Sequence, residues 1–157
     1  MKRLVPVLCL LCAVIYAGST RAEEQAIAIE GTYLLLQSDM YQRVLSFDRG
    51  GNVAQVSDQQ TLIGFTVGRG AWKQTGKNTV QARVIDFAFD LTSGKRIGPS
   101  LITYNLTFTD LESGHYQKIS GSYSGKVFPV GENPLAPKKP AIQSFGIEFK
   151  GKRVSLN

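Results

Sequence analysis

The sequence predicts an all-β fold, a single antiparallel and mostly up-and-down β-barrel of about eight or nine strands. No stretch after residue 22 keeps the apolar period of about 3.6 residues over a full helix length. Short segments with a two-residue period follow one another instead, separated by turn signals rich in Gly, Asn and Asp. Chains of this kind close into an up-and-down barrel or divide into a β-sandwich, which is the alternative architecture.

The first 22 residues have the three parts of a cleavable secretory signal peptide. Lys2 and Arg3 give a positive start, and residues 4–16 form an apolar run that is too short to span a bilayer. In Thr20-Arg21-Ala22, the small residues Thr20 and Ala22 stand at the −3 and −1 positions of a cleavage site after Ala22. We therefore expect a secreted or periplasmic protein with no stable membrane insertion.

The mature domain, residues 23–157, is weakly charged and lacks cysteine. Removal of Lys2, Arg3 and Arg21 leaves fifteen basic residues against twelve acidic ones, a net charge of +3. This charge is too small to indicate nucleic-acid binding. Both cysteines of the sequence lie within the signal peptide, and the domain has one histidine, His115. We therefore expect no disulfide, no metal site and no cofactor.

Turn signals divide the domain into the expected strands. Asp48-Arg49-Gly50-Gly51-Asn52 predicts a hairpin turn, because glycine accepts the positive φ that tight turns need. Residues 79–90 are apolar on both faces toward their end, which predicts a bulge or a sharp coil. The expected strands are residues 29–37, 41–47, 53–57, 61–67, 71–75, 79–90, 101–109, 118–127 and 142–149.

The later strands have the clearest inward faces. Tyr104 falls on the inward face of residues 101–109, and Tyr123 falls on that of residues 118–127. Two glycines flank Tyr123 on that face, and small residues there let a strand coil tightly, as barrel closure requires. Residues 128–140 carry four prolines and predict a long irregular loop, which we expect to cover part of a cavity mouth.

Two local patterns resemble the calycin group, the lipocalins and lipocalin-like domains. Gly31-Thr32-Tyr33 resembles the Gly-x-Trp opening of the first barrel strand, with Tyr33 where lipocalins carry Trp. Gly70-Ala71-Trp72-Lys73-Gln74-Thr75-Gly76 is similar to a segment of small exported lipocalin-like barrels, and allene oxide cyclase-type barrels are another relative by resemblance. Arg153 is the candidate for the late arginine that packs on the first aromatic. The resemblance implies a cup-shaped cavity for a small apolar molecule.

Four aromatic residues are the first candidates for lining such a cavity. Trp72 and Tyr33 offer apolar area with one polar atom each, so they either line the mouth or floor of a cavity or plug the barrel end. Tyr104 and Tyr123 fall on neighbouring inward faces, where their hydroxyls either bind a ligand or only pair across strands. We expect Trp72, Tyr104 and Tyr123 to share one interior.

Arg83 and Asp86 are the charged candidates, both within residues 79–90. Three positions apart, they lie on opposite faces of a regular strand unless a bulge brings them together. Asp86 has the parity of inward residues, and a buried carboxylate requires a partner. It therefore either contacts a polar part of the ligand or is turned to solvent by the bulge.

These observations favour an extracytoplasmic barrel that binds a small, mainly apolar ligand without catalysis. One alternative is a structural or protein-interaction module with a filled core. A second is a barrel enzyme of cyclase or isomerase type. His115 lies in a loop without the serine context of a catalytic triad, so no catalytic residue is assigned. Asn105 fits a glycosylation acceptor on the outward face of its strand.

Overall fold

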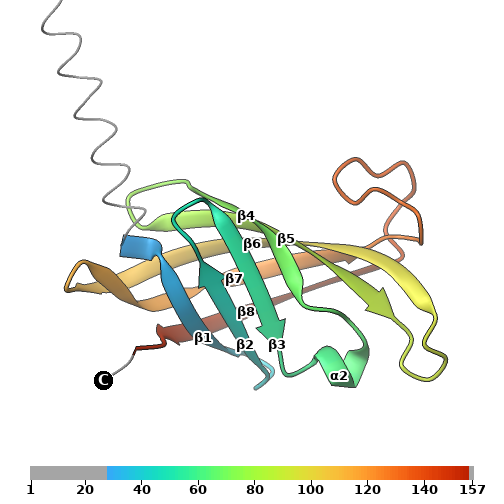
Figure 1. Cartoon of the computed structure of the whole chain (residues 1–157), viewed down its shortest axis with the longest axis horizontal. Coiled ribbons are helices and arrows are strands. Elements are labelled where there is room, and N and C mark those ends of the chain that lie inside the picture. The colour runs from blue at the N-terminus through green and yellow to red at the C-terminus, as the bar shows by residue number, and fades with distance from the viewer. Residues whose placement is uncertain (1–27, 156–157) are drawn as a thin grey trace, which may run out of the picture.

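The computed structural model describes residues 28–155, which form a closed barrel of eight antiparallel strands in sequence order (Figure 1). The last strand pairs with the first, so the sheet has no free edge. This confirms the predicted up-and-down barrel over the sandwich. The predicted signal peptide lies outside the described residues. The strands are β1 Gly31–Gln37, β2 Gln42–Phe47, β3 Asn52–Ser57, β4 Gly68–Gln74, β5 Thr79–Phe89, β6 Arg96–Glu112, β7 His115–Val127 and β8 Gln143–Arg153.

The prediction of a strand at residues 61–67 is wrong. The chain there forms α2, a single helical turn at Gln60–Ile63, and then only an isolated bridge from Phe65 to Ala88. Gly64 ends the turn with a φ of 74°, and a Cβ at this position would lie 2.1 Å from the Phe89 carbonyl oxygen. The left-handed glycine therefore breaks what the sequence presents as an extended segment.

The predicted irregularity at the end of β5 is present. The pairing register of β5 with β6 shifts between Ala88 and Phe89. Arg83 and Asp86 both precede this shift, so they stay on opposite faces of a regular strand. Arg83 is exposed on the outer face, and Asp86 is buried inside.

Close approach of neighbouring strands depends on glycine at two inward positions. A Cβ on Gly70 of β4 would lie 1.8 Å from the Arg83 carbonyl oxygen of β5. A Cβ on Gly121 of β7 would lie 2.1 Å from the Asn105 carbonyl oxygen of β6, and Gly121 also has a φ of 156°. The inward glycines thus permit the strong coiling that a small closed barrel needs.

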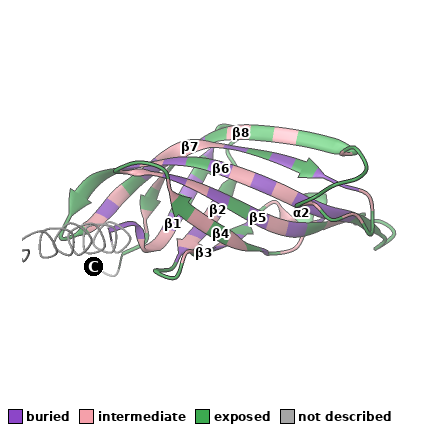
Figure 2. Ribbon diagram, turned by 90° about the horizontal axis from the view of Figure 1, so that it is seen from above, coloured by how far each residue is buried: buried purple, intermediate pink, exposed green. Residues whose placement is uncertain are grey.

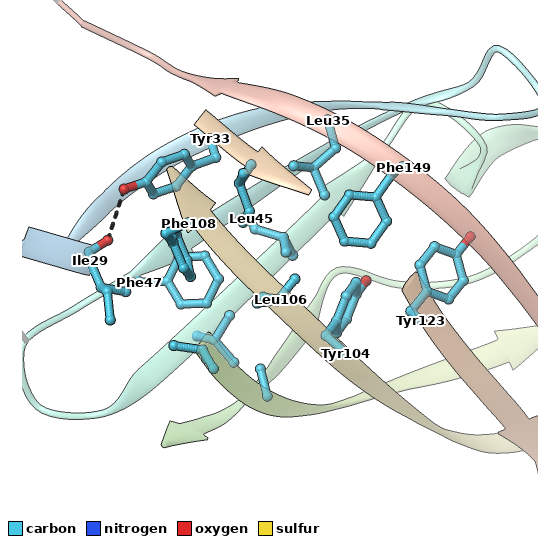
Figure 3. Packing of buried hydrophobic residues seen from close by; sticks show 14 of the residues in the cluster. Ile29, Tyr33, Leu35, Leu45, Phe47, Tyr104, Leu106, Phe108, Tyr123 and Phe149 are labelled. Carbon is cyan, nitrogen blue, oxygen red and sulfur yellow. Dashed lines mark hydrogen bonds between the residues drawn. The ribbon is translucent and has the colours of Figure 1, made fainter. Parts of the chain in front are cut away.

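Aromatic side chains fill one end of the barrel, which we call the Tyr33 end (Figure 3). The rings of Tyr33, Phe47 and Phe108 meet edge to face, with centroids 5.3 to 6.0 Å apart. Burial alternates along the strands because every second side chain points into this core (Figure 2). The Tyr33 end is therefore a packed core.

Arg153 of β8 closes the Tyr33 end. Its guanidinium carbon lies 5.7 Å from the centroid of the Tyr33 ring, and its Nη1 donates to the Glu30 carbonyl oxygen at 2.7 Å. A Cβ on Gly31 would lie 2.7 Å from this guanidinium, so the glycine makes room for it. The late arginine thus packs on the first-strand aromatic, as the resemblance implied.

Within residues 28–155 no helix is long and apolar enough to cross a membrane.

Candidate functional site

A polar network crosses the barrel interior on the other side of the aromatic core. Figure 3 shows Tyr104 and Tyr123 at the far side of the core from Tyr33, with their hydroxyls pointing away from it. Their ring centroids are 5.3 Å apart, on the adjacent strands β6 and β7. The buried polar side chains around them come from β1, β2, β3, β5 and β6, and they are Gln37, Arg43, Gln55, Asp86 and Ser100.

Arg43 of β2 is the centre of this network and is only 3% exposed. Its Nη1 donates to the Tyr104 hydroxyl at 2.7 Å and to Gln55 Oε1 at 3.0 Å, and its Nη2 donates to the Tyr123 hydroxyl at 3.3 Å. The guanidinium carbon also lies 4.6 Å from the Tyr123 ring centroid. Burial alone would lower the pKa of Arg43, but Tyr104, Tyr123 and the Asp86 carboxylate outweigh it and raise that pKa. The guanidinium is therefore a fixed positive charge inside the barrel.

Gln55 of β3 connects this charge to Asp86. Its Oε1 accepts hydrogen bonds from Arg43 and from the Tyr104 hydroxyl, while its Nε2 donates to Asp86 Oδ2 at 3.0 Å. On the other side of Arg43, the Tyr123 hydroxyl donates to Gln37 Oε1. The result is a continuous hydrogen-bonded chain from β1 to β5 across the interior, which fixes these side chains in position.

A cavity of about 290 Å³ lies beside the network, at the end of the barrel that carries α2. We call this the α2 end. Arg43, Asp86 and Tyr123 line the cavity together with Ser100. The remaining lining is largely apolar and includes Ile63, Phe65, Ala88, Ile102, Val127, Phe145 and Ile147. The cavity therefore combines apolar walls with a small set of fixed polar groups, the usual make-up of a small-molecule site.

Two buried atoms of lining residues lack a hydrogen-bond partner within the described part of the chain. They are Arg43 Nε and Asp86 Oδ1. Burial raises the pKa of the Asp86 carboxyl, although the Ser100 hydroxyl, the charge of Arg43 and the Gln55 amide each lower it. A buried polar atom without a partner costs free energy, so water or a ligand is needed to satisfy both atoms.

Comparison with known proteins gives a structural similarity but no family. No family model and no curated protein matches the sequence. Among solved structures, the chain is similar in fold to pallilysin from Treponema pallidum. The TM-score is 0.43 at 13% sequence identity, over 97% of this chain and 99% of that chain. This similarity concerns the fold alone, so the chemistry of the site is argued only from the side chains of this protein.

Three of the sequence-predicted site residues lie at the network. Tyr123 and Asp86 line the cavity, and Tyr104 lies behind them, fully buried and bonded to Arg43 and Gln55. Asp86 points inward, as its parity indicated, and Gln55 is the partner that its carboxylate requires. These three come from neighbouring strands; strand alternation predicted an inward position for the two tyrosines and left two alternatives for Asp86, which the structure places inside.

The other three predicted site residues lie elsewhere. Trp72 packs edge to face on Phe47 near the Tyr33 end, and its Nε1 donates to the Asp48 carbonyl oxygen at 3.0 Å. It packs against the same core cluster as Tyr104 and Tyr123, but it does not line the cavity at the α2 end. Tyr33 is fully buried in the packed core, where its hydroxyl donates a hydrogen bond to the Ile29 carbonyl oxygen at 3.1 Å. Arg83 is exposed on the outer face of β5 and has no part in the cavity.

The predicted cover of the cavity is also in a different place. The lining of the cavity includes Gln59, Ile63 and Phe65, in and around α2, and no residue of 128–140. The proline-rich segment instead borders a separate hollow on the outer face of β5 and β6, beside Phe87 and Pro99. α2, the β5–β6 turn and the β7–β8 connection lie at the right-hand end of Figure 1. The β3–β4 connection, and not the proline-rich segment, therefore contributes to the wall of the cavity.

Sequence reasoning missed Arg43, Gln55 and Gln37. Each lies on the buried face of its strand: Arg43 has the parity of Leu45, and Gln55 has the parity of Val53. A polar residue at an inward position was the available signal, and it was applied only to Asp86.

Within residues 28–155 no group of His, Cys, Asp and Glu side chains is arranged to hold a metal ion.

Proposed function

We propose that this protein binds a small, mainly apolar ligand in the cavity at the α2 end, and that it does so outside the cytoplasm after cleavage of its signal peptide. The observation that carries the proposal is the cavity of about 290 Å³, whose apolar walls meet Arg43 and Asp86, each with one unpartnered buried atom. The volume is at the lower limit of ligand sites, about 300 to 1,000 Å³. The ligand is therefore small.

The two ends of the barrel support a binding function over a filled structural module. The Tyr33 end is closed by packed aromatic rings and by Arg153, as expected of a lipocalin-like cup. The α2 end keeps a cavity that reaches the exposed residues Asp39 and Ile63. A fixed floor with one open end is the arrangement that lets a small molecule enter without unfolding the barrel.

The test is binding of a fluorescent apolar probe, N-phenylnaphthylamine, to the mature protein. We expect saturable fluorescence enhancement for the native chain and its loss in Ile102→Phe, because a larger side chain on the cavity wall fills the space. Thr103→Phe, at the adjacent position on the opposite face of β6, is the matched control and should bind as the native chain does. Native mass spectrometry of the exported protein would identify what copurifies. A folded barrel that binds neither probe nor copurifying ligand would favour the filled module.

Asp86 gives specific support to a second candidate, a barrel enzyme of cyclase or isomerase type. Its carboxyl is buried at the cavity wall and has a raised pKa, which suits proton transfer to or from a bound molecule. In that case a ligand recovered after incubation would be an isomer of the one supplied, and Asp86→Asn would prevent the conversion. Unchanged ligand, recovered and analysed by chromatography, would leave the binding function alone.

A further inference from the structure

Two buried polar atoms of the cavity lining, one a donor and one an acceptor, make no hydrogen bond within residues 28–155. Arg43 uses three of its five N–H groups, all on the two terminal nitrogens, in the network, while its buried Nε makes no hydrogen bond within residues 28–155. Asp86 uses Oδ2 for Gln55 and has the Ser100 hydroxyl beside its carboxyl, while Oδ1 itself makes no hydrogen bond within residues 28–155. A ligand that satisfies both atoms must supply an acceptor and a donor in the same part of the molecule.

The charges at the cavity point to a ligand without net charge. Arg43 is balanced by the carboxylate of Asp86 when that group is ionised, and Gln55 joins the two. A further carboxylate, Asp39, lies exposed at the mouth. An anionic ligand therefore meets two acidic groups of the lining, and a cationic ligand meets the fixed charge of Arg43. Burying a further charge beside either would be costly.

From this arrangement we propose that the ligand carries an uncharged polar head that both donates and accepts hydrogen bonds, such as a carboxamide or a primary alcohol, on an apolar body. The head accepts from Arg43 Nε–H and donates to Asp86 Oδ1. The apolar body lies against the aromatic and aliphatic side chains of the cavity wall, among them Phe65 and Phe145. This inference rests on the proposed function, since it names the class of ligand for the same cavity.

The test is a series of ligands that share one alkyl chain and differ only in the head group. Octanamide, octanol, octanoate, octylamine and octane are each used to displace N-phenylnaphthylamine from the mature protein at neutral pH. We expect octanamide and octanol to bind about tenfold to a hundredfold more tightly than the other three, the range for hydrogen bonds to charged groups. Tightest binding by octanoate or octylamine would overturn the proposal.

A charge-neutralising variant tests the same assignment independently. Asp86→Asn keeps the side-chain shape and an acceptor for Gln55 but removes the negative charge beside Arg43. Octanoate should then gain about tenfold relative to octanamide, because the buried guanidinium is left without its counter-charge. Glu112→Gln makes the same charge change at an exposed position in β6 outside the cavity lining, and it should leave the ratio unchanged. An unchanged ratio in Asp86→Asn would contradict the role of Asp86.

The outcomes separate this inference from the function on which it rests. Equal displacement by all five compounds would mean that the cavity binds the apolar chain without discriminating between head groups. The head-group proposal would then fail, and the proposed function would stand. No displacement by any compound, together with no probe binding, would overturn both. The native chain alone decides between these outcomes, so the test does not depend on the folding of a variant.

Discussion

Arg43 and Asp86 bind opposite ends of the same amide, that of Gln55. The carbonyl oxygen of the amide accepts from the guanidinium at 3.0 Å, and its nitrogen donates to the carboxylate at 3.0 Å. Each charge thus meets the end of the amide dipole that suits it. Because the amide is buried, this bridge is what lets two opposite charges remain in the barrel interior beside a cavity.

Replacement of Gln55 by leucine should destabilise the barrel by roughly 3 kcal/mol or more. The change leaves Arg43 Nη1, the Tyr104 hydroxyl and Asp86 Oδ2 without this partner, and each buried unsatisfied group costs about 1 to 3 kcal/mol. Urea unfolding followed by circular dichroism measures the loss. Gln81→Leu makes the same change on the outer face of β5 and should cost no more than about 0.5 kcal/mol. Equal effects of the two variants would contradict the bridge.

Stability should depend on pH through Asp86 in the direction opposite to that of an ordinary surface aspartate. Burial raises its folded pKa, so its contribution is greatest below the unfolded value of about 3.9 and is lost as pH rises through the folded pKa. Asp86→Asn removes this dependence and should gain stability relative to the native chain between about pH 4 and neutral pH. Urea midpoints at the two pH values measure the difference.

Asp90 offers a control of opposite sign for this measurement. The Ser93 hydroxyl and backbone N–H hold the pKa of the exposed Asp90 carboxyl below its ordinary value. Its stabilising contribution is therefore present above about pH 3.9 and is lost as pH falls through the folded pKa. Asp90→Asn should therefore lose relative stability only as pH rises to about 3.9, and it should show little further change between about pH 4 and neutral pH. The same trend in both variants would mean that Asp86 is not held in a desolvated site.

The barrel and its inward faces follow from the sequence because a two-residue period marks one face of each strand. Tyr104 and Tyr123 were predicted to lie inside on that basis, whereas for Asp86 the same period left the interior and solvent as alternatives. The period gives no position along the barrel axis, which depends on register and strand tilt. Trp72 therefore lies on the inward face of its strand, as predicted, but it packs on Phe47 toward the Tyr33 end.

The contacts across the barrel could not be read from the sequence. Arg43 and Tyr104 are 61 residues apart and lie on strands that do not pair, β2 and β6. Their meeting depends on the diameter and stagger of the closed sheet, which no local pattern encodes. α2 is missed for a related reason, because a single helical turn is too short to show a period of its own.

Two glycine substitutions should separate backbone clashes from side-chain clashes in the barrel wall. Gly70→Ala places a Cβ 1.8 Å from the Arg83 carbonyl oxygen, so two strands must move apart and the barrel should be strongly destabilised. Gly125→Ala places a Cβ 2.1 Å from the tip of the Phe145 ring, which can rotate away. Thermal unfolding should show the larger loss for Gly70→Ala. Gly125→Ala should instead alter probe binding, since Phe145 lines the cavity, and an unfolded Gly125→Ala barrel would refute this distinction.

Three buried tyrosines should ionise only when the barrel unfolds in alkali. Burial raises the pKa of Tyr33, Tyr104 and Tyr123, although Arg153 opposes this effect for Tyr33 and Arg43 opposes it for the other two. A raised folded pKa means that stability is retained below the unfolded value of about 10 and falls as pH rises above it. Tyrosinate absorbance should therefore include a cooperative step at the pH where the β signal in circular dichroism is lost. Tyr123→Phe should shrink that step by the signal of one tyrosine, whereas smooth ionisation of all tyrosines near pH 10 in a folded barrel would contradict their burial.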